Sequence, residues 1–158
     1  MRSLSLALIL LASSAVAQDS TPFAQQPYSA SGQTSLLSLS DVMAISQMRH
    51  IKLWQAAKAE NWPLATYEAD KLRDSLFRAA TLYVNIPVPL VKSSDEQLTA
   101  IAAAAKQRDL RAFDKAFADL TVSCNACHQA AGLDFIRMRT PSSSPFSDQD
   151  FTPAKTTR

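Results

Sequence analysis

The chain has 158 residues, of which 47% are hydrophobic and 19% are charged, a composition typical of one globular domain with a sizeable core. Two glycines are too few for a Gly-rich phosphate-binding loop or for the many tight turns of a β-rich fold. The net charge of +2 argues against binding to nucleic acid by phosphate neutralisation.

The N-terminal segment 1–17 has the features of a secretory signal peptide. Arg2 is its positive charge, residues 4–11 form a short apolar run, and Ala15-Val16-Ala17 is a small-x-small cleavage site. The run is shorter than the roughly 20 residues that cross a bilayer. We therefore expect cleavage after Ala17, export to a bacterial periplasm and no stable membrane insertion. An uncleaved anchor is the alternative.

A helical domain is predicted over residues 36–132, after a flexible lead-in at 18–35 that is rich in Gln, Ser, Thr and Pro. Its first helix is expected near 39–59, capped by Ser38 or Ser40. One stripe of this helix carries polar and sulfur-containing side chains at helical spacing, namely Met43, Gln47, His50 and Trp54.

Two proline-containing segments divide the next part of the chain. Pro63 suits the first turn of a second helix near 63–83, with Asn61 or Trp62 as its cap. The prolines within 85–89 predict an extended connector, because proline lacks the N–H that a helix interior needs.

Two further helices complete the predicted domain. Overlapping capping boxes over 93–97 predict the start of the third helix, and Asp109 can cap a fourth helix that ends at Gly132. Four helices joined by short links predict an all-α, antiparallel four-helix bundle. The segment 133–158 is more apolar than a linker, so we expect an extended tail that wraps partly over the bundle, with disorder as the alternative.

Cys124, Cys127 and His128 form C-x-x-C-H, the attachment motif of c-type haem. On a helix the two thiols share one face and can form thioethers with the haem vinyl groups, while the histidine ligates the iron. The other ring nitrogen of His128 is expected to donate to a carbonyl or carboxylate. A redox dithiol or half of a zinc site are the alternatives. The first usually comes with an α/β pattern, which is absent, and the second needs more Cys and His than the chain has, although carboxylates could help.

A C-x-x-C-H near the end of the last helix of a bundle resembles the class II c-type cytochromes, which include cytochrome c-prime and its low-spin relatives. The resemblance covers roughly 36–132. It implies one covalent haem c and two types of site: five-coordinate iron that binds diatomic gases, or a methionine of the first helix as sixth ligand for electron transfer. Relatives of this kind are often dimers, so a homodimer stays open.

The chain departs from that family pattern at two places. Gly132 stands where class II members usually carry a basic residue, and the chain continues to residue 158, well past the motif. The segment from Gln47 to Glu68 is also similar to an uncharacterised group of bacterial periplasmic monohaem proteins, which suggests a coherent family without supplying a function.

Met43 is the first candidate for the sixth ligand. In an up-down-up-down bundle the start of the first helix is level with the end of the last, and His128 lies roughly 5 Å and Met43 roughly 6 Å from those ends. His50, two turns on and about 10 Å from Met43, is the alternative ligand. Met138 could fold back from the tail, whereas Met48 is expected to pack elsewhere or face outward.

His50 also has a purely structural interpretation, as a polar side chain hydrogen-bonded to Gln47, a haem propionate or the second helix. Arg49 next to it is expected to be mostly solvated. Arg49 and His50 are the only nearby pair that could serve a haem peroxidase, and adjacent helical residues diverge in direction.

These features predict an exported monohaem c-type cytochrome that carries electrons between redox partner proteins in the periplasm and is not an enzyme. The alternative is a five-coordinate haem protein that binds or senses diatomic gases. A haem-carrying subunit of a larger complex, docked through the tail, is a further possibility. No nucleic acid partner is expected.

Overall fold

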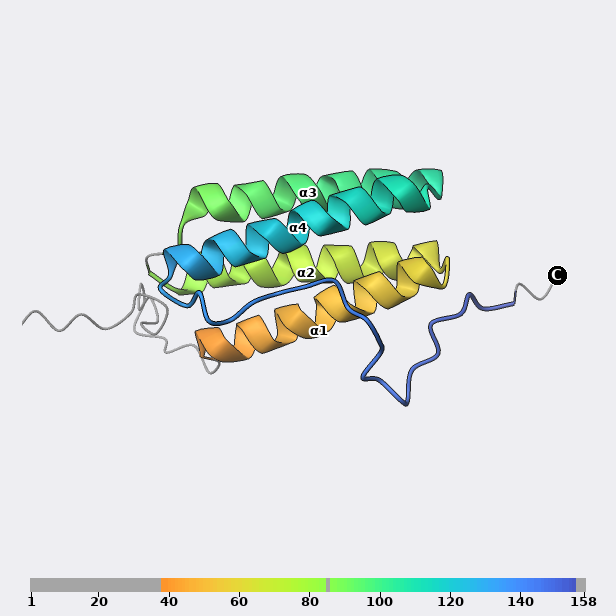
Figure 1. The fold of residues 1–158 in the computed structure, drawn as a ribbon, viewed down its shortest axis with the longest axis horizontal. Coiled ribbons are helices and arrows are strands. Elements are labelled where there is room, and N and C mark those ends of the chain that lie inside the picture. The colour runs from red at the N-terminus through yellow and green to blue at the C-terminus, as the bar shows by residue number, and fades with distance from the viewer. Residues whose placement is uncertain (1–37, 85, 156–158) are drawn as a thin grey trace, which may run out of the picture.

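The computed structural model describes residues 38–84 and 86–155, and this part of the chain folds as a bundle of four helices (Figure 1). The helices are α1 (Leu39–Lys58), α2 (Trp62–Leu82), α3 (Val88–Gln107) and α4 (Leu110–Ala130). No strand occurs among the described residues, so the predicted all-α four-helix bundle is confirmed. The predicted signal peptide (1–17) and lead-in (18–35) lie outside the described residues.

Consecutive helices run in opposite directions along the bundle (Figure 1). α2 packs against both α1 and α3, and α4 packs mainly against α3. Of the neighbouring helix pairs, α1 and α4 share the fewest contacts. The segment that follows α4 runs through the space between them (Figure 1).

The predicted caps of α1, α2 and α4 are present. Ser38 caps α1 through a capping box in which its hydroxyl accepts from the Asp41 N–H and the Asp41 carboxylate accepts from the Ser38 N–H. Asn61 caps α2, which begins one residue before Pro63. The Asp109 carboxylate accepts two backbone N–H bonds at the start of α4.

α3 begins earlier than predicted. It starts at Val88, directly after Pro87, so the prediction of an extended connector over 85–89 is wrong for its last two residues. Pro89 lies in the first turn, where no N–H has an intrahelical partner, and therefore costs no hydrogen bond. The Ser94 hydroxyl, predicted to cap the helix, instead donates to the Leu90 carbonyl within it.

α4 ends in a tight reversal of the chain at Gly132. Gly132 has a φ of +69°, the left-handed conformation that glycine adopts without strain. The Gly132 N–H donates to the Gln129 carbonyl, and the Leu133 N–H donates to the His128 carbonyl at 2.8 Å. This Schellman motif turns the chain back toward the last turn of α4.

The core consists of two clusters of buried apolar side chains. The larger cluster fills the half of the bundle near the α1–α2 and α3–α4 turns and includes Leu53, Phe113 and Phe117. The smaller cluster lies at the other end and includes Leu39 and Tyr83. In the described part of the chain, no helix combines the length and apolar character needed to cross a membrane.

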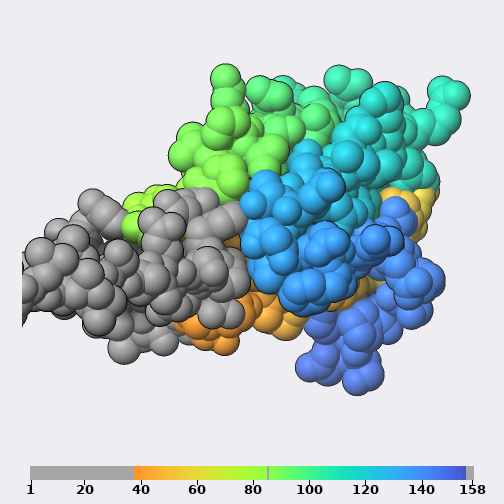
Figure 2. Space-filling model, turned by 60° about the vertical axis from the view of Figure 1, so that its left-hand side comes forward, coloured from red at the N-terminus to blue at the C-terminus, as the bar shows by residue number. Residues whose placement is uncertain are grey.

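The tail residues 133–155 form no helix; the first part lies against the bundle and a later part protrudes from it (Figure 2). The Asn61 amide donates to the carbonyls of Phe151 and Thr152, both at 3.2 Å, and Phe151 packs against the larger core cluster. The Lys52 ammonium lies 4.7 Å from the centre of the Phe146 ring. These contacts connect the far end of the tail to the α1–α2 end of the bundle.

Candidate functional site

A cavity of about 270 Å³ lies beside α1 and the last turns of α4. All four helices and the tail contribute to its wall, and Leu72 of the larger core cluster and Leu39 of the smaller one both line it. Most of the lining side chains are apolar. The cavity therefore lies between the two core clusters.

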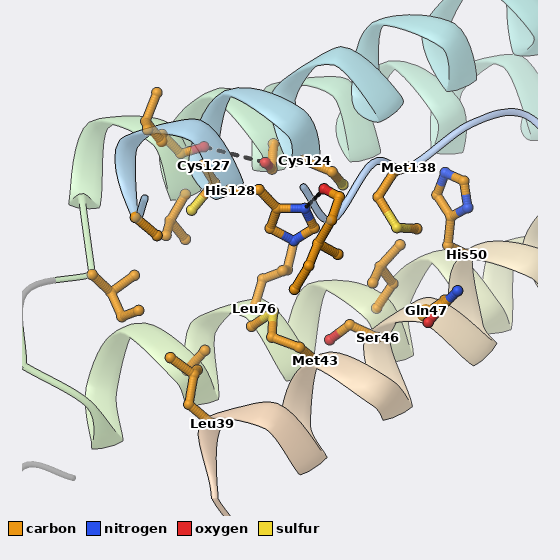
Figure 3. Close-up of a pocket in the computed structure, with 18 of the residues that line it drawn as sticks. Leu39, Met43, Ser46, Gln47, His50, Leu76, Cys124, Cys127, His128 and Met138 are labelled. Carbon is orange, nitrogen blue, oxygen red and sulfur yellow. Dashed lines mark hydrogen bonds between the residues drawn. The ribbon is translucent and has the colours of Figure 1, made fainter. Parts of the chain in front are cut away.

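Cys124, Cys127 and His128 all line this cavity (Figure 3). They belong to the last two turns of α4, so the helix itself holds both thiols and the imidazole along one side of the space. Both cysteines are free thiols. The structure thus brings together the three residues of the sequence motif on a single wall.

Burial raises the pKa of both cysteine thiols. It raises the pKa of Cys124 to about 12, with a smaller contribution from the neighbouring Cys127, whose own pKa is raised by burial. A redox dithiol pair functions through a thiolate with a lowered pKa. The opposite direction found here disfavours the redox interpretation of the motif.

A hydrogen bond from the tail fixes the ring of His128. Its Nδ1 lies 2.8 Å from the backbone carbonyl of Ile136. Because a carbonyl only accepts, Nδ1 carries the proton and Nε2 keeps its lone pair. The expectation that this histidine donates to a carbonyl is confirmed, and Nε2 is free to ligate.

The three side chains that the sequence analysis named as candidates for the sixth ligand all line the cavity. Met43 and His50 project from α1, Met138 comes from the tail, and the side chains point into the same space as His128 (Figure 3). Met43 is half-buried. Met48 is 45% exposed and takes no part in the lining, in agreement with its predicted position on another side of α1.

His50 is buried against α4 and has one partner there. Its Nε2 lies 3.0 Å from the Thr121 hydroxyl, which donates to the Phe117 carbonyl and therefore accepts from His50. Nδ1 is buried without a partner in the described structure. Burial lowers the pKa of His50 to about 4, so the ring is neutral at pH 7. Gln47 and the second helix were predicted as structural partners of His50. This prediction is wrong, because the partner is Thr121 on α4.

Arg49, the residue before His50, does not line the cavity. The Arg49 guanidinium pairs with the Glu68 carboxylate at 2.9 Å, and the Glu68 side chain is only 3% exposed. The prediction of a mostly solvated Arg49 is therefore wrong, since this charge compensates a buried carboxylate. Of the Arg49–His50 pair, His50 alone lines the cavity.

The hydrogen bonds that hold the tail beside His128 were not predicted from the sequence. Asn125, between the two cysteines, accepts from the Met138 N–H at 2.7 Å and donates to the Met138 carbonyl at 3.0 Å. The partners are thirteen residues apart and no short-range pattern connects them. The asparagine inside the motif was visible in the sequence, but not the segment that it binds.

Within the described residues, no group of three or more His, Cys, Asp or Glu side chains is arranged to hold a metal ion by itself. Comparisons with models of protein families, with curated proteins and with solved structures found no match to this chain.

Proposed function

We propose that this protein is an exported monohaem c-type cytochrome that carries electrons in the periplasm. The observation that carries the proposal is the joint position of Cys124, Cys127 and His128 on one wall of a mainly apolar cavity. Two thiols for covalent attachment and one imidazole for the iron are the donor set that the motif requires.

The chain's own side chains fit a haem group in this cavity. Cys124 and Cys127 would hold it covalently, and His128 offers Nε2 because Nδ1 is occupied by the Ile136 carbonyl. The predominantly apolar lining suits a porphyrin face. Haem bound there would supply a one-electron iron couple.

Met43 is the side chain that we propose as a second iron ligand if haem binds in this cavity. It lines the cavity from α1 and is half-buried, and a thioether raises the reduction potential relative to a second histidine. His50 is the weaker choice for a ligand, because its Nε2 is bonded to Thr121 and Nδ1 alone has a free lone pair. Met138 remains the candidate from the tail.

A haem peroxidase uses a distal base together with a cation, and Arg49 is paired with Glu68 outside the cavity lining. A small carrier would bind its redox partner proteins transiently.

The apolar lining favours one alternative function, the binding or sensing of a diatomic gas at five-coordinate iron. In that case Met43 would be a packing residue, as methionine often is. The two functions differ in whether the iron has an open position.

Optical spectra of the exported, matured protein decide between them. They would be recorded oxidised, reduced, and reduced with carbon monoxide. A low-spin spectrum with the weak iron–thioether band, unchanged by carbon monoxide, supports the electron carrier. A high-spin spectrum that shifts with carbon monoxide would contradict it and favour the gas-binding alternative.

A further inference from the structure

The tail contributes directly to the environment of His128, the ligand assigned above. After the reversal at Gly132, the Ile136 N–H donates to the Leu133 carbonyl at 2.9 Å, which closes a turn. This turn brings the Ile136 carbonyl to 2.8 Å from Nδ1 of His128. The acceptor for the ligating histidine therefore belongs to a segment without helical structure.

The side chain of Asn125 holds that segment in place. Its Oδ1 accepts from the Met138 N–H and its Nδ2 donates to the Met138 carbonyl, so one amide satisfies both backbone groups of a residue two positions after Ile136. Few side chains can both accept and donate in this way, and aspartate or alanine cannot. Asn125 itself is fixed by α4, within one turn of His128.

We infer that Asn125 is a positioning residue for His128 and that residues 133–139 form a strap through which it acts. Asn125 fixes Met138, the strap then fixes the Ile136 carbonyl, and that carbonyl fixes the proton and the orientation of the imidazole. This inference rests on the proposed function, since it concerns the strength of an iron ligand.

The strap should change the electronic properties of the ligand as well as its orientation. An acceptor on Nδ1–H makes the imidazole a stronger donor. A stronger donor stabilises the more highly charged, oxidised iron, so the loss of the bond should raise the reduction potential. A residue with only a packing role would not shift the potential in this defined direction.

A second attachment keeps the tail on the bundle when the strap is loosened. The Asn61 side chain donates to the carbonyls of Phe151 and Thr152, which lie far along the tail from Ile136. Asn61 thus provides a matched control: Asn61→Ser removes these two amide bonds and keeps an oxygen that can cap α2. Asn125→Ala removes the two bonds at the other end.

The test compares the matured wild type, Asn125→Ala and Asn61→Ser. Haem content is measured first, then the reduction potential, and then the NMR signal and solvent exchange of the His128 Nδ1 proton in the reduced protein. We expect Asn125→Ala to raise the potential and accelerate proton exchange, whereas Asn61→Ser changes neither. Equal potentials and equal exchange in Asn125→Ala and wild type would overturn the inference, as would an equal shift in Asn61→Ser.

Amide exchange in the wild type tests the strap without a substitution. The Met138 N–H should exchange slowly because Asn125 accepts from it, and fast exchange would overturn the inference even if the variant cannot be matured. Wild type without covalent haem would contradict the proposed function itself. Covalent haem with an unprotected Met138 amide would contradict only the role of Asn125.

Discussion

The two imidazoles of the chain have complementary tautomers. His128 donates through Nδ1 to the Ile136 carbonyl, whereas His50 donates through Nε2 to Thr121. Each ring therefore keeps the lone pair of its other nitrogen, and both residues line one cavity. His128 has its free nitrogen at the ring edge distant from its own helix, which favours it as the primary ligand.

Substitution of Met43 tests the assignment of the sixth ligand. Met43→Leu keeps the volume but removes the thioether, so we expect loss of the iron–thioether band and new binding of carbon monoxide in the reduced protein. Met48→Leu is the matched control on the same helix, since Met48 is 45% exposed. Loss of the band in Met138→Leu but not in Met43→Leu would move the ligand to the tail.

His50 should make the stability of the fold depend on pH. Burial lowers its pKa from 6.5 to about 4, so an unfolded chain takes up a proton in this range that the folded chain does not. The contribution of His50 to the free energy of unfolding is then fully present above pH 6.5. It is lost as the pH falls toward and through 4, which lowers the free energy of unfolding by up to about 3 kcal/mol. Urea unfolding at pH 7 and pH 4.5 should show a smaller loss for His50→Gln than for wild type. Equal losses would show that His50 does not carry this dependence.

At the level of elements, α1 and α2 are connected by a partly buried ion pair. The Arg49 guanidinium is 2.9 Å from the Glu68 carboxylate, and the side chain of Glu68 is 3% exposed. Removal of one partner leaves the other charge buried without compensation, which is the costly way to break such a pair. The loss of one partner is therefore expected to destabilise the packing of α1 against α2.

Arg49→Ala should lower the free energy of unfolding by about 2 kcal/mol, because Glu68 would stay buried without its partner, while the 28% exposure of Arg49 keeps the cost below that of a fully buried pair. Lys115→Ala is the control: it breaks an exposed i,i+4 pair with Asp119 and should cost below about 0.5 kcal/mol. Urea denaturation of the two variants measures both values. Similar costs would mean that the Arg49–Glu68 pair contributes no more than a surface pair.

Local chemistry allowed most helix ends to be predicted from the sequence. Ser38, Asn61 and Asp109 cap the helices that they were expected to cap, because capping depends on neighbours within three residues. The start of α3 was predicted too late, since Pro89 is acceptable in a first turn and Ser94 is buried in the packed helix. The first-turn proline and the capping boxes over 93–97 were both acceptable local starts for this helix, and the packing of α3 determined which of them is used.

The candidate site was predictable only in part, for the same reason. The spacing of Cys124, Cys127 and His128 defines the motif, and helical periodicity placed Met43 and His50 on one stripe. The bonds from His128, His50 and Asn125 to their partners join residues that the helical period does not relate. They depend on the path of the tail and the packing of α1 against α4, which only the folded structure reveals.

At the level of the whole molecule, the tail contributes side chains to the core and to the cavity of the bundle. α1 and α4 make little contact with each other, and the first part of the tail runs between them before the rest continues past α1 and beyond the bundle (Figure 1). Phe151 packs against the larger core cluster, and Ile136 and Met138 line the cavity. The segment past the motif, in which the chain departs from class II cytochromes, is thus part of both the core and the candidate site.

Phe151→Ala should destabilise the protein by about 1–2 kcal/mol, because a partly buried aromatic ring loses its contacts with the core. Phe135→Ala, in the same tail, is the matched control: that ring is 75% exposed, and its removal should change stability by less than about 0.5 kcal/mol. Thermal unfolding of the two variants makes the comparison. Equal effects would show that the tail is not anchored through Phe151.

The intact mass of the denatured, exported protein tests the central claim most directly. We predict the mass of a chain that begins at Gln18 plus one haem, retained after denaturation because two thioethers hold it. The variant with Cys124→Ala and Cys127→Ala should have the mass of the chain alone. A wild-type protein that is matured alongside a known c-type cytochrome and still shows no added haem would contradict the assignment of Cys124, Cys127 and His128.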